Sequence, residues 1–583
     1  MGDEVGAVVA AKSERIGEEA LRLIKVEWEV LPFVLDPIES MQPGAPVIHP
    51  ELSQSNILPA EPIGGADVFV NIGDVERGFT EADINIEVKA IYHNATQCSL
   101  DNWCCLASWK DDQLTVWSNS YEADQTRMFL SEMLEIPQNK VRVISPFVGG
   151  QFGRGDTGED PFFIYTALLA KRTGSPVKFK HTRRESFHNT RQPIIYTCKM
   201  GAGREGTISS SYFKSIGNAG AYADHTCFAT KFVPQEIVEV SFAHIPNVKM
   251  ESYAVYTNKI PGCMMRGVGN NQFNLIFGLA VDALAEKLGI DPIELALKNF
   301  GHKWEKLPDK SLEAVLHEGA RRIGWDKRHK PGKGRTYDGS KKRGIGFSFH
   351  PGWHAAWQEQ RRGTIQAGIK LNPDGTVVLL APTVECGPGS IVIEDGLVCL
   401  KAQVKKSITV KRLLQKGDLV PIVAMASSRP HTRKTGVPYQ ATFAEVEVDT
   451  ATGQTQVLRM IILNDCGTVM FASGAEAQQC GGQCMTVGES LLEEIVYDEK
   501  TGVPLNFNWV EYKIPTIADM PKVEPVLFEV WRGAGEYGAC GIGEGVVTCG
   551  PRAIANAIYN AIGVRIDDIP ITPDKILKAL GRI

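Results

Sequence analysis

The spacing of apolar and polar residues along this 583-residue chain predicts helices and strands in both halves. Apolar positions recur at helical spacing in residues 122–134, 161–173, 272–288, 311–323 and 551–563. Alternating or β-branched runs predict strands at 344–349, 364–371 and 376–380, and a hairpin in which the strands 439–448 and 456–463 flank a turn at 449–453. Because strands and helices are mixed throughout, the expected fold class is α+β.

The N-terminal region predicts a small piece of sheet. Residues 1–10 and 26–31 have strand character, and residues 11–25 between them have the helical period. A strand at the very first residues implies that the other strands of its sheet lie elsewhere. The proline-rich residues 32–62 then predict a long connector over the surface.

Glycine-rich loops recur at five separate places. They lie within residues 148–156, 265–272, 385–389, 478–483 and 538–544. Glycine allows backbone amides to approach a ligand closely. None of these loops has the spacing of a phosphate-binding loop or of a dinucleotide fingerprint. A large ligand held by several separated loops would explain all five together.

The last of these loops contains the best candidate for a catalytic base. Glu544 follows Gly541-Ile-Gly and precedes the predicted helix 551–563, whose N-terminus adds partial positive charge. The alternative is that this carboxylate is a solvated residue that caps the helix. The similar glycine loops upstream favour the catalytic role.

Composition narrows the classes of partner and ligand. The net charge is only −6 and no basic patch dominates, which argues against binding to nucleic acid. Without an apolar run of about 18 residues the chain predicts no membrane span, and we expect a cytoplasmic protein. The 13 cysteines include no Cys-x-x-Cys, and His350 and His354 lack a third ligand at zinc-site spacing. We therefore expect no metal held mainly by side chains of this chain.

Four segments occur in an order typical of one enzyme family. Residues 147–153 read Phe-Val-Gly-Gly-Gln-Phe-Gly, and residues 265–272 read Met-Arg-Gly-Val-Gly-Asn-Asn-Gln. Residues 512–521 contain Tyr-Lys-Ile-Pro-Thr and Asp-Met-Pro, and residues 541–544 read Gly-Ile-Gly-Glu. In these motifs the chain resembles the molybdopterin-binding large subunit of the molybdenum hydroxylases, the xanthine dehydrogenase and aldehyde oxidase family, over nearly its whole length.

The resemblance implies a molybdopterin-type molybdenum cofactor, with or without a cytosine dinucleotide, whose pterin dithiolene holds the metal. No protein side chain would ligate the molybdenum. Glu544 falls on the family's catalytic glutamate, which accepts a proton during oxygen transfer from water. The residues that would bind the cofactor are Gly150, Gln151, Phe152, Gly153, Arg266, Gly267, Cys386, Gly387, Gly389, Gln478, Gly541 and Gly543.

Four residues are expected to contact the substrate. Phe347 and Ser348 match a family Phe-Thr pair whose ring packs on a flat substrate, although an aromatic residue in a strand can equally belong to the core. Val268 stands where purine-oxidising members have a phenylalanine, and Asp156 stands where they have a substrate-orienting glutamate. The neighbourhood of Pro234 offers no arginine where xanthine enzymes have one. Xanthine is therefore disfavoured, and an aromatic or N-heteroaromatic substrate is expected.

The resemblance also implies domains and partners. Residues 1–35 would be a fragment of the family's α/β hammerhead domain and residues 36–65 a connector, followed by two large mixed α/β molybdopterin-binding domains, 66–303 and 304–583. The chain has no iron–sulfur or flavin motif. We expect partner subunits to supply the rest of the hammerhead domain, the iron–sulfur clusters and FAD.

Three functions follow from the resemblance. The preferred one is the catalytic subunit of a multi-subunit molybdenum hydroxylase that oxidises an aromatic or N-heteroaromatic compound with water as oxygen source, a coenzyme A thioester being one candidate. The second is reductive dehydroxylation of a hydroxyaroyl-thioester, as in the family's hydroxybenzoyl-CoA reductase branch. Because Pro388 and Ser120 stand where the family has glutamines, the third is a non-catalytic, cofactor-holding or scaffold subunit.

Overall fold

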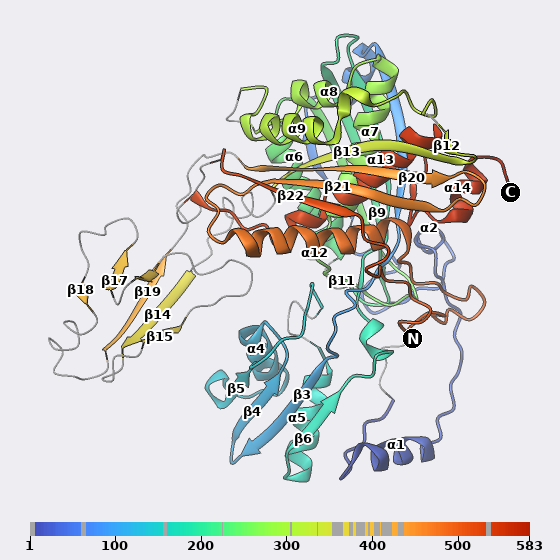
Figure 1. Ribbon diagram of the computed structural model, residues 1–583. Coiled ribbons are helices and arrows are strands. Elements are labelled where there is room, and N and C mark those ends of the chain that lie inside the picture. Colours follow the sequence, from blue (N-terminus) through green and yellow to red (C-terminus); the bar gives the residue numbers. More distant parts are fainter. Residues whose placement is uncertain are drawn as a thin grey trace.

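The computed structural model describes most of the chain. The described residues are 6–59, 66–154, 160–223, 226–302, 306–334, 336–352, 437–531 and 538–583, with the strand segments 365–371, 377–380, 391–394, 397–400, 408–409 and 422–428. Helices and strands are mixed along the chain, which confirms the predicted α+β class (Figure 1).

The first half is built around a six-stranded sheet. Neighbouring strands β8 and β9 are antiparallel, whereas β9 and β10 are parallel. The sixth strand comes from the far end of the chain and pairs in parallel with β2. In sheet order the strands are β1 (Ala66–Ile72), β10 (Asn247–Tyr256), β9 (Ile208–Gly220), β8 (Ile194–Ala202), β2 (Ile84–Tyr92) and β23 (Asp568–Ile569).

The second half contains a five-stranded sheet. Its central strands β20 and β21 form an antiparallel hairpin, with Gln440 opposite Asn464, which confirms the hairpin predicted around residues 449–453. β22 then joins β21 in parallel. In sheet order the strands are β12 (Thr336–Asp338), β13 (Lys341–Pro351), β20 (Tyr439–Asp449), β21 (Thr455–Asp465) and β22 (Lys522–Phe528).

Smaller sheets complete the strand content. One four-stranded sheet lies with its helices α4 and α5 at the lower end of the molecule in Figure 1. Its strands are β5 (Val141–Ile144), β4 (Gln113–Ser118), β3 (Cys104–Lys110) and β6 (Val177–Lys180). The other small sheets are formed by β15 (Val377–Leu380), β14 (Ile365–Leu371) and β19 (Ile422–Ser428), by β16 (Ile391–Glu394), β17 (Leu397–Leu400) and β18 (Ile408–Thr409), and by β11 (Gly262–Cys263) with β7 (Thr190–Arg191).

The helices begin and end at residues suited to those positions. For example, Asp309 accepts hydrogen bonds from the first amides of α9, and Gly324 ends that helix with a left-handed φ of +79°. Within the described residues, every helix is too short or too polar to cross a bilayer. The helices are α1 (Glu14–Leu23), α2 (Pro37–Ser40), α3 (Val75–Glu81), α4 (Ala123–Met133), α5 (Phe162–Thr173), α6 (Val233–Ser241), α7 (Asn270–Leu288), α8 (Pro292–Asn299), α9 (Lys310–Ile323), α12 (Ala472–Leu491), α13 (Gly550–Ile562) and α14 (Pro573–Ala579).

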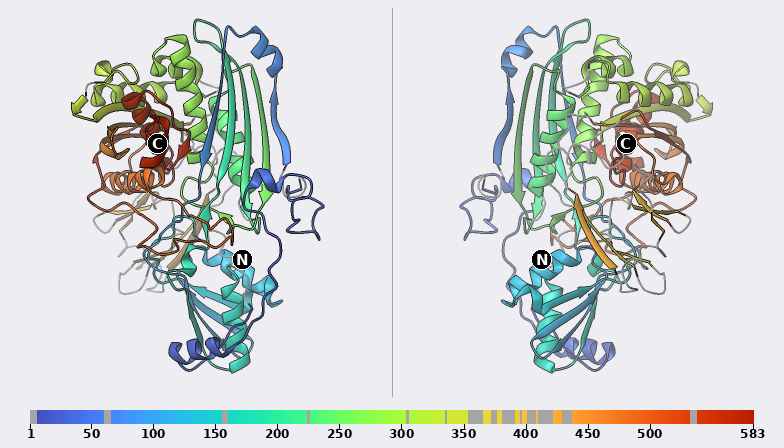
Figure 2. Two further views of the ribbon diagram at one scale, coloured as in Figure 1. Left: turned by 90° about the vertical axis from the view of Figure 1, so that its right-hand side faces the viewer. Right: turned by 90° about the vertical axis from the view of Figure 1, so that its left-hand side faces the viewer.

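Helices α7 and α13 lie between the two large sheets and join them. α7 packs on the first sheet, α13 packs on the second, and the two helices contact each other (Figure 2). α13 approaches β13 closely because a side chain at Gly344 or Gly346 would lie about 2.2–2.3 Å from backbone atoms of the helix. The largest of four apolar clusters among the described residues therefore runs through both halves, from Val70 to Ile576. The division at residues 303/304 does not separate two cores, and as a domain boundary it stays a prediction.

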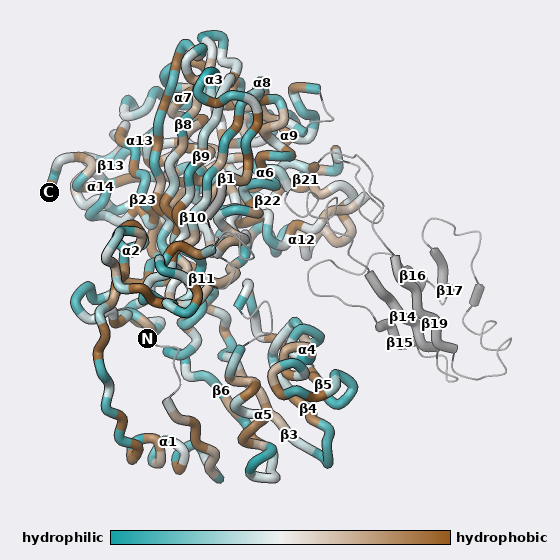
Figure 3. Tube along the Cα trace, turned by 180° about the vertical axis from the view of Figure 1, so that it is seen from behind, coloured by the Kyte–Doolittle hydropathy of each residue, from teal (hydrophilic) through white to brown (hydrophobic). Residues whose placement is uncertain are grey.

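The N-terminal segment differs from its prediction. The helix is present as α1, but residues 6–10 and 26–31 form no strand. Trp28, Val30 and Leu31 are 68%, 84% and 67% exposed, and α1 buries none of its residues. Figure 3 shows α1 apart from the main body, with apolar residues on its surface. Because a strand needs a neighbour for its backbone hydrogen bonds, these residues stay extended without one.

Candidate active site

Arg266 connects the glycine loops that lie far apart in the sequence. Its backbone N–H donates to the carbonyl of Phe152 at 2.9 Å. Its guanidinium donates through Nε to the carbonyl of Gly543 and through Nη2 to Oε1 of Gln478 at 2.6 Å. The side chain is nearly buried, so these bonds are shielded from water. One arginine thus brings together residues 150–153, 265–267, Gln478 and residues 541–544. The predicted glycine loop at 478–483 is corrected, because these residues belong to helix α12.

The loop at residues 150–153 needs its glycines. Gly150 and Gly153 both have φ of +98°, and Phe152 has φ of +57°. A side chain at Gly153 would lie 2.5 Å from the carbonyl oxygen of Met264. Only glycine therefore allows this loop to pack against the segment that carries Arg266.

Asp101 and Asn119 hold the same loop from behind. A carboxylate oxygen of Asp101 accepts from the Gly149 amide at 2.9 Å and from Asn119 Nδ2 at 2.6 Å. Gln151 donates through Nε2 to the carbonyl of Asn119 at 2.6 Å, and Arg154 donates to the carbonyl of Asp101 at 2.6 Å. The sequence gave no signal for Asp101 or Asn119, because their role depends on contacts across about 20 to 50 residues.

Glu544 lies in a loop that other elements fix on both sides. The Cys540 amide donates to the Cys466 carbonyl at 2.8 Å, and the Glu544 carbonyl accepts from the Val547 amide at 3.1 Å. Gln483 of α12 donates to the Val546 carbonyl at 2.7 Å. The residue preceding α13 is Cys549, so Glu544 is not the cap of that helix.

A buried arginine lies within electrostatic reach of Glu544. Burial alone would lower the pKa of Arg191, but Glu489, Tyr92 and Glu544 raise it above its usual value. Glu544 is partly exposed as a residue, but its Oε2 is buried, and the positive charge of Arg191 attracts the carboxylate.

The loops fit a large ligand held through backbone groups. Oε1 of Gln151 is buried and has no hydrogen-bond partner among the described residues. None of these residues has an atom within 4 Å of the position that a side chain at Gly543 would take. Among the described residues, no group of three or more His, Cys, Asp or Glu side chains is placed to hold a metal ion.

The predicted substrate residues are placed differently. Phe347 has no exposed surface, and its ring is enclosed by Trp325, Phe443 and Arg552. Phe347 belongs to the main apolar core, which is the alternative that the sequence left open, and its contact with a substrate stays a prediction. Ser348 is also fully buried and accepts from Asn274 at 2.9 Å. Val268 is 3% exposed and belongs to the main core.

The remaining predicted residues divide into two groups. Gly267, with φ of +80°, follows Arg266 directly, and Gly541 lies in the same loop as Gly543. The structure brings both near the contacts of Arg266. Asp156, Cys386, Gly387 and Gly389 lie outside the described residues.

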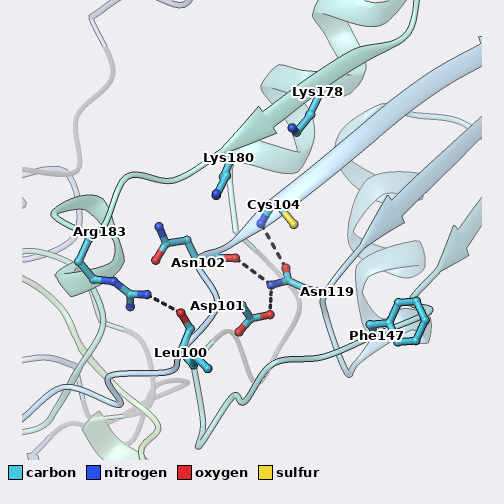
Figure 4. Close-up of a pocket in the computed structure, with 9 residues that line it drawn as sticks. All are labelled: Leu100, Asp101, Asn102, Cys104, Asn119, Phe147, Lys178, Lys180 and Arg183. Carbon is cyan, nitrogen blue, oxygen red and sulfur yellow. Dashed lines mark hydrogen bonds between the residues drawn. The ribbon is translucent and has the colours of Figure 1, made fainter. Parts of the chain in front are cut away.

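A basic pocket of about 490 Å³ opens beside Phe147, which leads into the glycine loop at residues 150–153 (Figure 4). Lys178 and Lys180 point toward it from β6, and Phe147 lies on the side away from Arg183. Arg183 donates to the carbonyls of Ser99 and Leu100 at 2.7 and 2.6 Å. Glu544 is not among the lining residues, which are Leu100, Asp101, Asn102, Cys104, Asn119, Phe147, Lys178, Lys180 and Arg183.

Comparison with known proteins identifies the class of ligand. Residues 60–300 and 381–521 each match a family model described as a molybdopterin cofactor-binding domain. A putative xanthine dehydrogenase molybdenum-binding subunit of Escherichia coli is 26% identical, over 99% of this chain and 86% of its own length. The nicotine 6-hydroxylase large subunit of Paenarthrobacter nicotinovorans is 23% identical, over 98% of this chain and 81% of its own length.

A solved structure has the same fold. Quinoline 2-oxidoreductase from Pseudomonas putida 86 superposes with a TM-score of 0.84 at 20% identity, covering 98% of this chain and 84% of that one. The two cofactor-binding models match the chain in order, and relatives align along its length. The chain therefore belongs to the molybdenum hydroxylases of the xanthine dehydrogenase and aldehyde oxidase family, as a molybdopterin-binding large subunit and molybdenum-dependent oxidoreductase.

Proposed function

We propose that this chain is the catalytic subunit of a multi-subunit molybdenum hydroxylase that oxidises an aromatic or N-heteroaromatic compound. Water supplies the oxygen, and a coenzyme A thioester is one candidate substrate. The observation that carries the proposal is the contact of Arg266 with Gly543 and Gln478, because it places the Glu544 loop beside the Arg266 loop and helix α12.

The residues of the chain have distinct roles in this proposal. Bound molybdenum cofactor supplies the two-electron acceptor and the oxygen-transferring metal. The glycine loops let backbone groups reach the cofactor, and the unsatisfied Oε1 of Gln151 can accept a hydrogen bond from it. Arg266 fixes Gly543, so the adjacent Glu544 keeps its position. Glu544 accepts the proton released as oxygen is transferred.

Support for the substrate class comes from relatives and from the sequence. The nicotine 6-hydroxylase large subunit is named for a reaction on an N-heteroaromatic compound. Relatives named for xanthine and hypoxanthine are also present at 26% and 28% identity. Val268 and Asp156 stand where the purine-oxidising members have phenylalanine and glutamate, which distinguishes this chain from that pattern.

Support for partner subunits comes from the exposed N-terminal segment. Leu23, Trp28 and Val30 are 82%, 68% and 84% exposed, an unusual concentration of apolar surface. A subunit that carries the remaining hammerhead strands would cover it. We propose further partners that hold iron–sulfur clusters and FAD, which carry the electrons away.

The test is substrate-dependent reduction of the purified complex. A panel of N-heteroaromatic compounds and aroyl-thioesters is mixed anaerobically with the complex, and flavin and iron–sulfur absorption is followed. Incorporation of ¹⁸O from labelled water into product is expected. Dehydroxylation of a hydroxyaroyl-thioester by the reduced complex would instead establish the reductive direction. A molybdenum-replete complex that turns over no member of the panel in either direction would contradict the proposal. Acid release of cytidine monophosphate would identify a dinucleotide form of the cofactor.

A further inference from the structure

A buried ion pair lies directly beneath the loop that carries Arg266. Nη2 of Arg191 is 2.8 Å from Oε1 of Glu489, and both side chains have at most 1% of their surface exposed. The other carboxylate oxygen of Glu489 accepts from the hydroxyl of Tyr92 and from Asn271 Nδ2 at 3.1 Å. The carboxylate is thus fully engaged, and its orientation toward Arg191 is fixed.

Arg191 uses its guanidinium to hold three consecutive backbone carbonyls. Nη2 donates to the carbonyl of Arg266 at 2.7 Å, and Nη1 donates to those of Met265 and Gly267 at 3.3 and 3.4 Å. A planar guanidinium can make these bonds and an ion pair at once, which a lysine ammonium cannot reproduce in the same geometry. The backbone from which the Arg266 side chain extends is therefore fixed from below.

One face of α12 carries both Gln478, which binds Arg266, and Glu489, which binds Arg191. Gln478 and Glu489 are 11 residues apart, which is about three helical turns and places them on the same face. Gln478 binds the guanidinium of Arg266, whereas Glu489 acts on its backbone through Arg191. Between them, Gln483 donates to the Val546 carbonyl at 2.7 Å. The helix therefore sets the distance between the Arg266 loop and the Glu544 loop.

We infer that Glu489 is a positioning residue for the active site. Through Arg191 it fixes the backbone of residues 265–267, so that Arg266 reaches both Gly543 and Gln478. Glu489 itself contacts neither the Glu544 loop nor Gln478. The inference rests on the proposed cofactor site through Arg266.

Two variants test this role. Glu489→Gln keeps the shape of the side chain but leaves Arg191 without its counter-charge. Because an uncompensated buried charge destabilises the fold, the double variant Arg191→Met with Glu489→Leu is made as well. Replacing both charges by apolar groups of similar volume preserves folding in other proteins, yet it removes every hydrogen bond that Arg191 donates to the three carbonyls. The Gly267 carbonyl still accepts from the amides of Asn270 and Asn271.

The readouts are cofactor content per folded chain, thermal unfolding, and kcat and KM. Molybdenum is measured by mass spectrometry and pterin by fluorescence after oxidation, on complex recovered by size exclusion. For the folded double variant we expect cofactor content reduced at least about fivefold, or kcat reduced about 100-fold with KM within about twofold, because small displacements at a reacting site cost this much. Glu489→Gln should show the same losses together with a lower unfolding temperature.

Glu493→Gln is the matched control. It is the same substitution four residues further along, just after the end of α12, on a buried carboxyl that accepts from the hydroxyl of Tyr512 at 2.7 Å and is not the ion-pair partner of Arg191. Parent-like cofactor content and kcat are expected. If the folded double variant also keeps parent-like values, the ion pair is only structural and the inference is overturned. Because cofactor content is measured without substrate, this result is independent of whether the proposed substrate class is right.

Discussion

Replacing Glu544 by glutamine isolates its function as a base. The amide has nearly the same shape, and backbone groups anchor the loop beside it. The Gly543 carbonyl accepts from Arg266, and the Glu544 carbonyl accepts from the Val547 amide at 3.1 Å. The loop should therefore keep its position, and the loss should be confined to proton transfer. Removing a general base lowers the rate about 100-fold to 10,000-fold, equivalent to about 2.7 to 5.5 kcal/mol in activation free energy.

The assay is anaerobic reduction of the complex by saturating substrate, with molybdenum and pterin content measured on the same sample. We expect parent-like cofactor content and a reduction rate lower by at least about 100-fold. The Glu493→Gln variant controls for the loss of a buried acid in the same half of the chain. A cofactor-replete Glu544→Gln enzyme that reacts within about threefold of the parent rate would refute the assignment of Glu544 as the base.

Three other predictions follow from the structure. Gly153→Ala should reduce cofactor content, because Gly153 has φ of +98° and the alanine Cβ would lie 2.5 Å from the Met264 carbonyl oxygen. Parent-like molybdenum content would contradict this. Val268→Phe should lower the free energy of unfolding by about 1 to 3 kcal/mol, measured with denaturant, since Val268 lies in a packed core. Burial raises the pKa of Glu493 from its usual 4.5 to about 8. The folded state therefore favours the protonated carboxyl, and this contribution to stability is full below about pH 4.5 and lost as the pH rises through 8. Glu493→Gln should flatten this pH dependence, and unchanged unfolding curves between about pH 5 and 9 would disprove it.

Helices and hairpins could be predicted from the sequence where the local pattern of apolar and turn residues is enough to define them. The helical period and the flanking glycines gave α5, α7, α9 and α13 to within one or two residues, and the hairpin β20–β21 followed from its turn. The N-terminal strands were wrong because a strand depends on a neighbour that its own sequence does not contain. For the same reason the place of β23 in the first sheet could not be predicted.

The site was predictable only where the sequence carries a motif. The glycine loops and Glu544 were found this way, and the structure adds that Arg266 joins them. Arg191 and Glu489 were missed because their pairing spans 298 positions and neither lies in a recognisable pattern. For Phe347 the motif left both a substrate contact and a place in the core open, and full burial shows that it packs in the core.

The apolar core shared by both halves has a consequence for biosynthesis. Residues 150–153 and Arg266 leave the ribosome early, but the partners of Arg266 in α12 and in the loop at 541–544 are made on the order of half a minute later. The six-stranded sheet also stays incomplete until its strand β23, which lies near the C-terminal end, has been translated. Until then, neither a closed core nor a complete cradle for the cofactor exists. Cofactor insertion must therefore follow translation, and the nascent chain has to keep its unfinished apolar surfaces from aggregating during that interval.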